Sequence, residues 1–390
     1  MRNGFFCAAA LCLLAACSRP EGAGFELSGD INGLQAGDTL LLASISLPNW
    51  QEGKSDTIVV EREGVFSAFI PAAESGLFLL KYKTKEGQEP LNCMGGSDIF
   101  ARPGDRIHLS GDLKYLGALP RRGGVYDNET ISRYDSMAVE DGRTRIDIFD
   151  KIMAYRRLEQ PDSVQKYGNL YNSYYSPEAF VALRDSIAQQ MGDNEYSACL
   201  YASYKLFDAT YEQLAERLSR FTPEVRGSRF GRVLDEQLKV LDRIAVGHKL
   251  PDFMLTDVDG KEVSLSDYRG KYVLLYHWGL CPGTFYVDPT IQALYGRYHE
   301  KGFEVLGLMA YDMSRYFDGE REKTEPFKSL LAHPWRTVRA DAEPNRFIKD
   351  ELFLSGVPIL MLVGPDGTTL VRGYSAAGAE VEKVLAERLQ

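Results

Sequence analysis

The sequence contains few cysteines, and no two of them stand at the C-x-x-C spacing. Six cysteines in 390 residues are too few to staple a fold with disulfide bonds. The missing C-x-x-C pair also removes the usual signal for a zinc site or a redox-active dithiol. We therefore expect no metal and no cofactor, and the role of each cysteine has to be judged alone.

Basic residues are in the minority. Lys and Arg number 45 against 55 Asp and Glu, a formal charge of −10, and no basic run is interleaved with aromatic residues. Nucleic acid is therefore not an expected partner. Hydrophobic residues make up 44% of the chain and charged residues 26%, which are ordinary globular values and exclude wholesale disorder. The length predicts two or three domains.

The apolar run from Phe5 to Ala16 is twelve residues long, too short to cross a hydrocarbon layer of about 30 Å as a mature helix. It follows Arg2 and ends in Leu14-Ala15-Ala16-Cys17, which resembles the lipobox of bacterial lipoproteins. A buried core helix is the alternative, but the position at the extreme N-terminus argues against it. The resemblance implies that residues 1–16 are a signal peptide and that acylated Cys17 anchors the protein in the cell envelope. We expect it to face the periplasm from the outer membrane.

Residues 25–115 show short β-type runs separated by turn residues such as Asn32-Gly33 and Pro103-Gly104-Asp105. The predicted strands are Thr39 to Ala43, Thr57 to Val60, Val65 to Ile70, Leu77 to Tyr82 and Ile107 to Ser110. This spacing predicts an all-β sandwich. No cluster of His, Asp and Glu occurs in it, so we interpret it as an accessory domain for structure or partner docking. Cys93 is expected to be a loop thiol or a half-buried apolar residue.

Residues 125–245 change to a helical period and predict an α-helical connector. Apolar faces recur at Ile146, Phe149, Met153 and Leu158, at Phe180, Leu183 and Ile187, at Leu214 and Leu218, and at Val233, Leu234, Leu238 and Leu241. Ser176 before Pro177 and Thr222 before Pro223 are typical helix starts. Cys199 falls on such a helix and is expected to be packed.

Residues 246–390 alternate strands and helices, which predicts an α/β domain closed by a hairpin and a helix. The predicted strands are Lys271 to Trp278, Phe303 to Ala310, Ile359 to Val363 and Thr368 to Val371. The predicted helices are Pro289 to Glu300, Asn345 to Leu352 and Ala379 to Leu389.

Several motifs of this domain resemble the TlpA/ResA-like thioredoxin-fold proteins of the AhpC/TSA redoxin superfamily. They are Leu250-Pro251-Asp252-Phe253, Asp259 to Leu265, Gly270 to Leu275, Lys301 to Gly307, Gly356-Val357-Pro358 and Pro365-Asp366-Gly367, in the family's order. The β region and the helical connector also resemble the accessory regions that precede such domains in exported lipoproteins. The resemblance implies a thioredoxin-like fold for residues 246–390.

In that family a strand leads into W-C-x-x-C and then a helix with a proline eight residues after the first Cys. Pro289 therefore matches Cys281 to the nucleophile, and the motif here is Cys281-Pro282-Gly283-Thr284. Thr284 replaces the resolving Cys, and the family's helix acid falls on Val287, one position before Asp288. A sulfur at a helix N-terminus meets unpaired N–H groups that favour the thiolate, and the Thr284 hydroxyl can act as a further donor.

The resemblance also implies a substrate-binding ledge. Pro358 matches the family's cis-proline, which leaves the Val357 backbone free to pair with a bound chain, and Trp278 belongs to the strand that approaches the thiol. His277 lies four residues before Cys281, where it either contacts the thiol or is a satisfied rim residue.

Without a second thiol, attack on a disulfide stops at the mixed disulfide. The first hypothesis is therefore monothiol exchange through Cys281 with protein thiols, protein disulfides or a small thiol. The alternative is a non-catalytic module that binds a partner at the same ledge. A peroxiredoxin-type peroxidase is disfavoured, because the Thr or Ser and the Pro that it needs before the Cys are Trp278 and Leu274 here.

Overall fold

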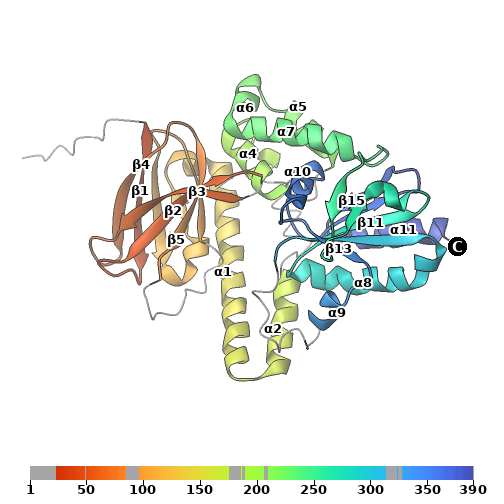
Figure 1. Cartoon of the computed structure of the whole chain (residues 1–390). Coiled ribbons are helices and arrows are strands. Elements are labelled where there is room, and N and C mark those ends of the chain that lie inside the picture. Colours follow the sequence, from red (N-terminus) through yellow and green to blue (C-terminus); the bar gives the residue numbers. More distant parts are fainter. Residues whose placement is uncertain are drawn as a thin grey trace, which may run out of the picture.

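The described N-terminal part of the chain is rich in β-strands (Figure 1). The computed structural model describes residues 23–48, 50–84, 96–174, 186, 189–205, 210–312, 323 and 327–389. One four-stranded sheet has the order β4-β1-β7-β8 and the other β3-β2-β5-β6. The bounds are β1 Gly24–Asn32, β2 Thr39–Ser46, β3 Gln51–Val59, β4 Val65–Pro71, β5 Gly76–Tyr82, β6 Ser97–Ala101, β7 Arg106–Asp112 and β8 Arg121–Arg122.

Alternation of apolar and polar side chains places one face of each sheet in a shared core. Phe25, Leu27 and Ile31 of β1 are buried, as are Leu40 and Leu42 of β2, and all five belong to one cluster. β1 pairs antiparallel with β4 and parallel with β7, and it was not among the predicted strands. Two short 3-10 turns, η1 (Leu113–Ala118) and η2 (Gly124–Asp127), lead into the helices.

The middle of the chain is helical. Its elements are α1 Glu129–Arg157, α2 Pro161–Tyr174, α4 Glu195–Leu200, the π-helical turn η3 Tyr201–Lys205, α5 Tyr211–Ser219, α6 Pro223–Gly227 and α7 Arg229–Ile244. Figure 1 shows α1 and α2 as neighbouring antiparallel helices. The start at Thr222 and Pro223 is confirmed, because the Thr222 side chain accepts the N–H of Val225.

One predicted apolar face of this region is wrong in part. Ile146 is buried, but Leu158 is 63% exposed because α1 ends at Arg157 and Leu158 is its C-cap. Ile148 and Ile152 are the residues buried near that end of α1 instead. The predicted face of Phe180, Leu183 and Ile187 and the start at Ser176-Pro177 lie outside the described residues.

A five-stranded sheet organises the C-terminal part, with the order β13-β12-β11-β14-β15. Central β11 runs parallel to β12 and antiparallel to β14. A separate hairpin of β9 and β10 precedes it. The bounds are β9 Met254–Thr256, β10 Glu262–Ser264, η4 Leu265–Tyr268, β11 Tyr272–Trp278, α8 Pro282–Tyr298, η5 His299–Lys301, β12 Phe303–Met309, α9 Phe327–Leu331, β13 Arg336–Arg339, η8 Asn345–Phe347, α10 Ile348–Glu351, β14 Ile359–Val363, β15 Thr369–Gly373 and α11 Ala377–Arg388.

Both faces of this sheet are covered, which explains the unbroken apolar run of β11. Leu274 and Tyr276 pack in one cluster with residues of α8 and α11, while Val273 and Leu275 belong to the other cluster, which extends into α7 and the N-terminal sheets. The helix predicted from Pro289 begins seven residues earlier, at Pro282, and contains Pro289 in its interior. None of the helices in the described part of the chain is long and apolar enough to cross a membrane.

Candidate functional site

Cys281 is the N-cap residue of α8. Its backbone is extended, with φ −143° and ψ 159°, and its sulfur accepts the N–H of Thr284 at 3.3 Å. Pro282 follows at the first turn, where a missing N–H costs no helical hydrogen bond. At Gly283 an added Cβ would lie 2.9 Å from a ring carbon of Pro358. Glycine there lets the start of the helix approach the Pro358 loop.

The Thr284 side chain completes the surroundings of the sulfur. The Cys281 Sγ lies 3.3 Å from the Thr284 Oγ1 and 3.3 Å from the carbonyl oxygen of Val357. Thr284 is fully buried, and its Oγ1 accepts the N–H of Gly279 at 3.5 Å. A protonated Cys281 can donate to either oxygen. A thiolate would receive the N–H and the hydroxyl of Thr284, so this residue can stabilise the charged sulfur.

The Val357–Pro358 peptide bond is cis, as the resemblance implies. The loop that carries it is held by His277, whose Nδ1 donates to the carbonyl of Gly356 at 2.8 Å. The His277 side chain is buried, and burial lowers its pKa to about 4, so the ring is neutral at pH 7. His277 therefore holds the loop that carries the cis-proline.

A buried carboxylate lies further along the same helix. Asp288 accepts the hydroxyl of Tyr276 at 3.0 Å and the side-chain amide of Gln292 at 2.6 Å, and the Nε2 of His333 lies 2.8 Å from it. Val287, where the family pattern places an acid, is buried and apolar, and Asp288 follows one position later. Sequence reasoning missed the network of Asp288, because His333 is 45 residues away and no motif connects the two.

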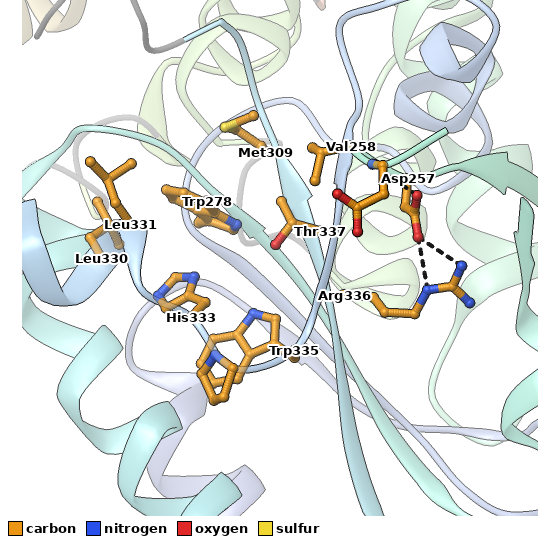
Figure 2. Close-up of a pocket in the computed structure, with 12 residues that line it drawn as sticks. Asp257, Val258, Trp278, Met309, Leu330, Leu331, His333, Trp335, Arg336 and Thr337 are labelled. Carbon is orange, nitrogen blue, oxygen red and sulfur yellow. Dashed lines mark hydrogen bonds and ion pairs between the residues drawn. The ribbon is translucent and has the colours of Figure 1, made fainter. Parts of the chain in front are cut away.

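Trp278 lies in a pocket of about 440 Å³ on the β12 and β13 side of the sheet (Figure 2). The indole is only 2% exposed. Its ring stands edge-on to His333, and His333 stacks on Trp335 with centroids 4.3 Å apart. Cys281 is not among the residues that line this pocket.

The other cysteines differ sharply from Cys281. Cys199 lies on α4 and is 1% exposed, and burial raises the pKa of its thiol well above the ordinary value. The expected packing of Cys199 is confirmed. Cys17 and Cys93 lie outside the described residues. Within the described ranges, no group of three or more His, Cys, Asp and Glu side chains is placed to hold a metal ion.

Comparisons with known proteins find similarities in the C-terminal part of the chain. Residues 246–331 match the AhpC/TSA family. The thiol-disulfide oxidoreductase ResA of Bacillus anthracis is 37% identical over 70 residues, which are 18% of this chain and 40% of that protein. ResA of Geobacillus kaustophilus is 46% identical over 66 residues, 17% of this chain and 38% of that protein. The chain thus spans about two fifths of the length of the curated relatives it matches.

Solved structures that the chain matches include the thioredoxin domain of a thiol-disulfide oxidoreductase from Bacteroides vulgatus, at 24% identity and a TM-score of 0.29, covering 37% of this chain and 99% of that one. A thioredoxin-like protein from Bacteroides caccae covers 58% of this chain and 84% of its own, at 16% identity and a TM-score of 0.37. The family match and the ResA relatives confirm that the C-terminal part contains a thioredoxin-like domain of the AhpC/TSA redoxin family.

Proposed function

We propose that the protein exchanges thiols and disulfides through the single thiol of Cys281, acting on protein thiols or disulfides or on a small thiol. The observation that carries the proposal is the position of the sulfur. It caps a helix, has the N–H and hydroxyl of Thr284 within 3.3 Å, and faces the cis-proline loop. The thiolate is the nucleophile in disulfide exchange, and at this position it would accept both of these hydrogen bonds.

The chemical step balances without a second cysteine in the chain. The Cys281 thiolate attacks one sulfur of a disulfide, a new sulfur–sulfur bond forms, and the other sulfur leaves as a thiolate that takes up a proton from water. An external thiol then attacks the mixed disulfide and releases Cys281 in its reduced form. The external thiol is the reductant, so turnover depends on its concentration.

Thr284 stands where the family has its resolving cysteine. A hydroxyl cannot displace a disulfide sulfur, but this one is fully buried, 3.3 Å from the Cys281 sulfur and held by Gly279. Its proposed role is to stabilise the thiolate before attack and after release. Val357 and Pro358 form the proposed ledge for the bound chain, whereas the Trp278 side chain is buried at the end of β11, against His333.

The location of the protein is part of the proposal. The lipobox-like segment ending at Cys17 supports an acylated protein of the cell envelope that faces the periplasm, with the outer membrane as the expected site. The β-rich part and the helices would then be accessory regions that hold the thioredoxin-like domain away from the lipid anchor.

A peptide disulfide-bonded to a small thiol tests the exchange reaction. The full-length protein should form one mixed disulfide at Cys281, detected by mass spectrometry, and an added thiol should reverse it. The Cys281→Ser variant is the control, because any adduct that it forms comes from the other five cysteines. Thr284→Val removes the hydroxyl at nearly constant shape and should slow adduct formation about tenfold, the value of one hydrogen bond to a charged group, whereas Thr284→Ser should keep the rate. Equal rates for native protein and Cys281→Ser would refute the proposal.

Partner binding without exchange is the second candidate, and Tyr286 favours it. This side chain is 77% exposed on α8, two residues after Thr284. An exposed aromatic ring on the helix that begins at Cys281 is typical of a protein contact. In this case Cys281→Ser would retain its cellular partners and Tyr286→Ala would lose them, whereas thiol exchange predicts covalent partners that disappear with Cys281→Ser.

A further inference from the structure

Tyr311 binds the backbone just before the thiol. It lies two residues after the end of β12, and its hydroxyl accepts the N–H of Leu280 at 2.8 Å. β11 and β12 are parallel neighbours, so their ends meet at the same edge of the sheet. A side chain that follows β12 therefore reaches the loop that follows β11, and this loop carries Cys281.

This side-chain contact continues the backbone pairing of the two strands. The N–H of Ala310, just after β12, donates to the carbonyl of Trp278 at 2.9 Å. Leu280 lies two residues beyond that carbonyl, and its part-buried N–H needs an acceptor. The Tyr311 hydroxyl supplies this acceptor, so the segment that leads to Cys281 stays attached to the end of β12.

Gly279 allows the Tyr311 ring to come this close. A Cβ added at Gly279 would lie 3.1 Å from the Cε1, 3.2 Å from the Oη and 3.3 Å from the Cζ of Tyr311. Ordinary contacts between carbon atoms are about 3.5–4.0 Å long. The Tyr311 ring therefore lies against the Gly279 backbone, and a larger residue at this position would push the ring away from the loop.

The same segment determines the direction of the Thr284 hydroxyl. The N–H of Gly279 donates to the Thr284 Oγ1 at 3.5 Å, and the N–H of Cys281 donates to the carbonyl of Gly279 at 3.0 Å. A hydroxyl carries one hydrogen and accepts at its lone pairs. Because the Thr284 oxygen accepts from Gly279, its hydrogen is left for another acceptor. The sulfur of Cys281, 3.3 Å away, is that acceptor once it is a thiolate.

We infer that Tyr311 is a positioning residue for Cys281. By accepting the N–H of Leu280, it fixes the segment whose Gly279 N–H directs the Thr284 hydroxyl toward the sulfur. The role of Tyr311 is thus exerted through Thr284. The inference rests on the proposed function, because it gives Tyr311 a part in preparing the thiolate that attacks a disulfide.

Alkylation of the full-length protein tests the positioning without a disulfide substrate. Iodoacetamide reacts with the thiolate, so its rate at Cys281, followed by peptide mapping at pH 7, reports on the surroundings of the sulfur. Tyr311→Phe keeps the ring and removes the acceptor, and it should slow alkylation about fivefold. Tyr295→Phe on α8, whose ring stacks on His299, is the matched control and should react at the native rate.

The direction of the change distinguishes positioning from space filling. A side chain that only fills space would leave Cys281 equally reactive, or more exposed and faster, when its hydroxyl is lost. A rate in Tyr311→Phe equal to or above the native rate would therefore overturn the inference. Gly279→Ala is a second variant, because its added methyl group meets the ring, and it should slow alkylation as Tyr311→Phe does.

A double variant tests whether Tyr311 acts through Thr284. Thr284→Val removes the hydroxyl, so adding Tyr311→Phe to it should change the alkylation rate by less than about twofold. A further loss of about fivefold in the double variant would refute the connection through Thr284. Mixed-disulfide formation is measured separately. If alkylation follows these expectations while native protein and Cys281→Ser form mixed disulfides at equal rates, the proposed exchange fails and the positioning by Tyr311 stands.

Discussion

Replacing Thr284 with cysteine should restore the missing half of a dithiol. Residue 284 is three positions after Cys281 on α8, and its Oγ1 already lies 3.3 Å from the Cys281 sulfur. A disulfide bond is about 2.0 Å long, so the two sulfurs have to approach by about 1.3 Å. Rotation about the side-chain bonds at a helix N-terminus can supply this. We expect the Thr284→Cys variant to form an internal disulfide under mild oxidation.

The stabilisation from this bond should be small. Chain-entropy arguments for a closed loop of about four residues give roughly 2 kcal/mol, with any strain subtracting from it. The new thiol replaces a fully buried side chain, so reagents from solvent should reach Cys281 first. The variant should then reduce a disulfide substrate over many turnovers with a dithiol reductant, because attack by residue 284 releases the mixed disulfide at Cys281.

Mass spectrometry after alkylation provides the assay. The mass of oxidised Thr284→Cys should be lower by two hydrogens, and Cys281 should resist alkylation until a dithiol reductant is added. Thr284→Ser is the matched control, and the Cys281→Ser/Thr284→Cys double variant should form no internal bond. If Thr284→Cys remains fully reduced under mild oxidation, the position of Cys281 relative to residue 284 is wrong, and with it the assignment of the nucleophile.

Four further outcomes follow from the burial and contacts of single residues. Asp288→Asn should lower the free energy of unfolding by about 2 kcal/mol in urea denaturation, because an amide turns an N–H toward groups that now donate to a carboxylate. Burial lowers the pKa of His277 to about 4 in the folded protein, while the unfolded chain takes up this proton near pH 6.5. The free energy of unfolding is therefore highest above about pH 6.5 and falls as the pH decreases below that value. Between pH 7 and pH 5 this loss should be about 2 kcal/mol, and His277→Asn should remove it. Cys281 should be alkylated at least about a hundredfold faster than buried Cys199 in the native protein, as measured by peptide mapping; equal rates would mean that Cys281 is a structural residue. Cys17→Ser should release the protein from membranes without detergent, and unchanged retention would contradict the lipid anchor.

The local parts of the C-terminal domain could be predicted from the sequence. The strand Ile359–Val363 has the bounds that its apolar run predicts, and β11 differs from its prediction by one residue at the start. The spacing of Pro289 from Cys281 also predicted that the thiol would begin a helix, as it does. Such features depend on neighbouring residues, turn chemistry and capping, which a single sequence displays directly.

The position of β1 was decided by pairing over a long distance. β1 lies between β4 and β7, and its parallel partner comes about 80 residues later in the chain, at Glu26 with Arg106. Leu158 has an apolar side chain at the predicted helical spacing, yet the helix ends before it and leaves it exposed. Helical periodicity indicates which residues share a face but does not show where the helix stops.

The side chains around Gly307 on β12 show most clearly which features the sequence determines and which the tertiary structure decides. By itself, the sequence determined the nucleophile candidate, the replacement of its partner by Thr284 and the strands that carry them. Only the tertiary structure brought Trp278, Trp335 and Thr337 together over a glycine of a third strand, and joined His333 to Asp288. Sheet register and the packing of side chains from separate strands set these contacts, because they depend on which distant segments pair, and no local pattern records that choice.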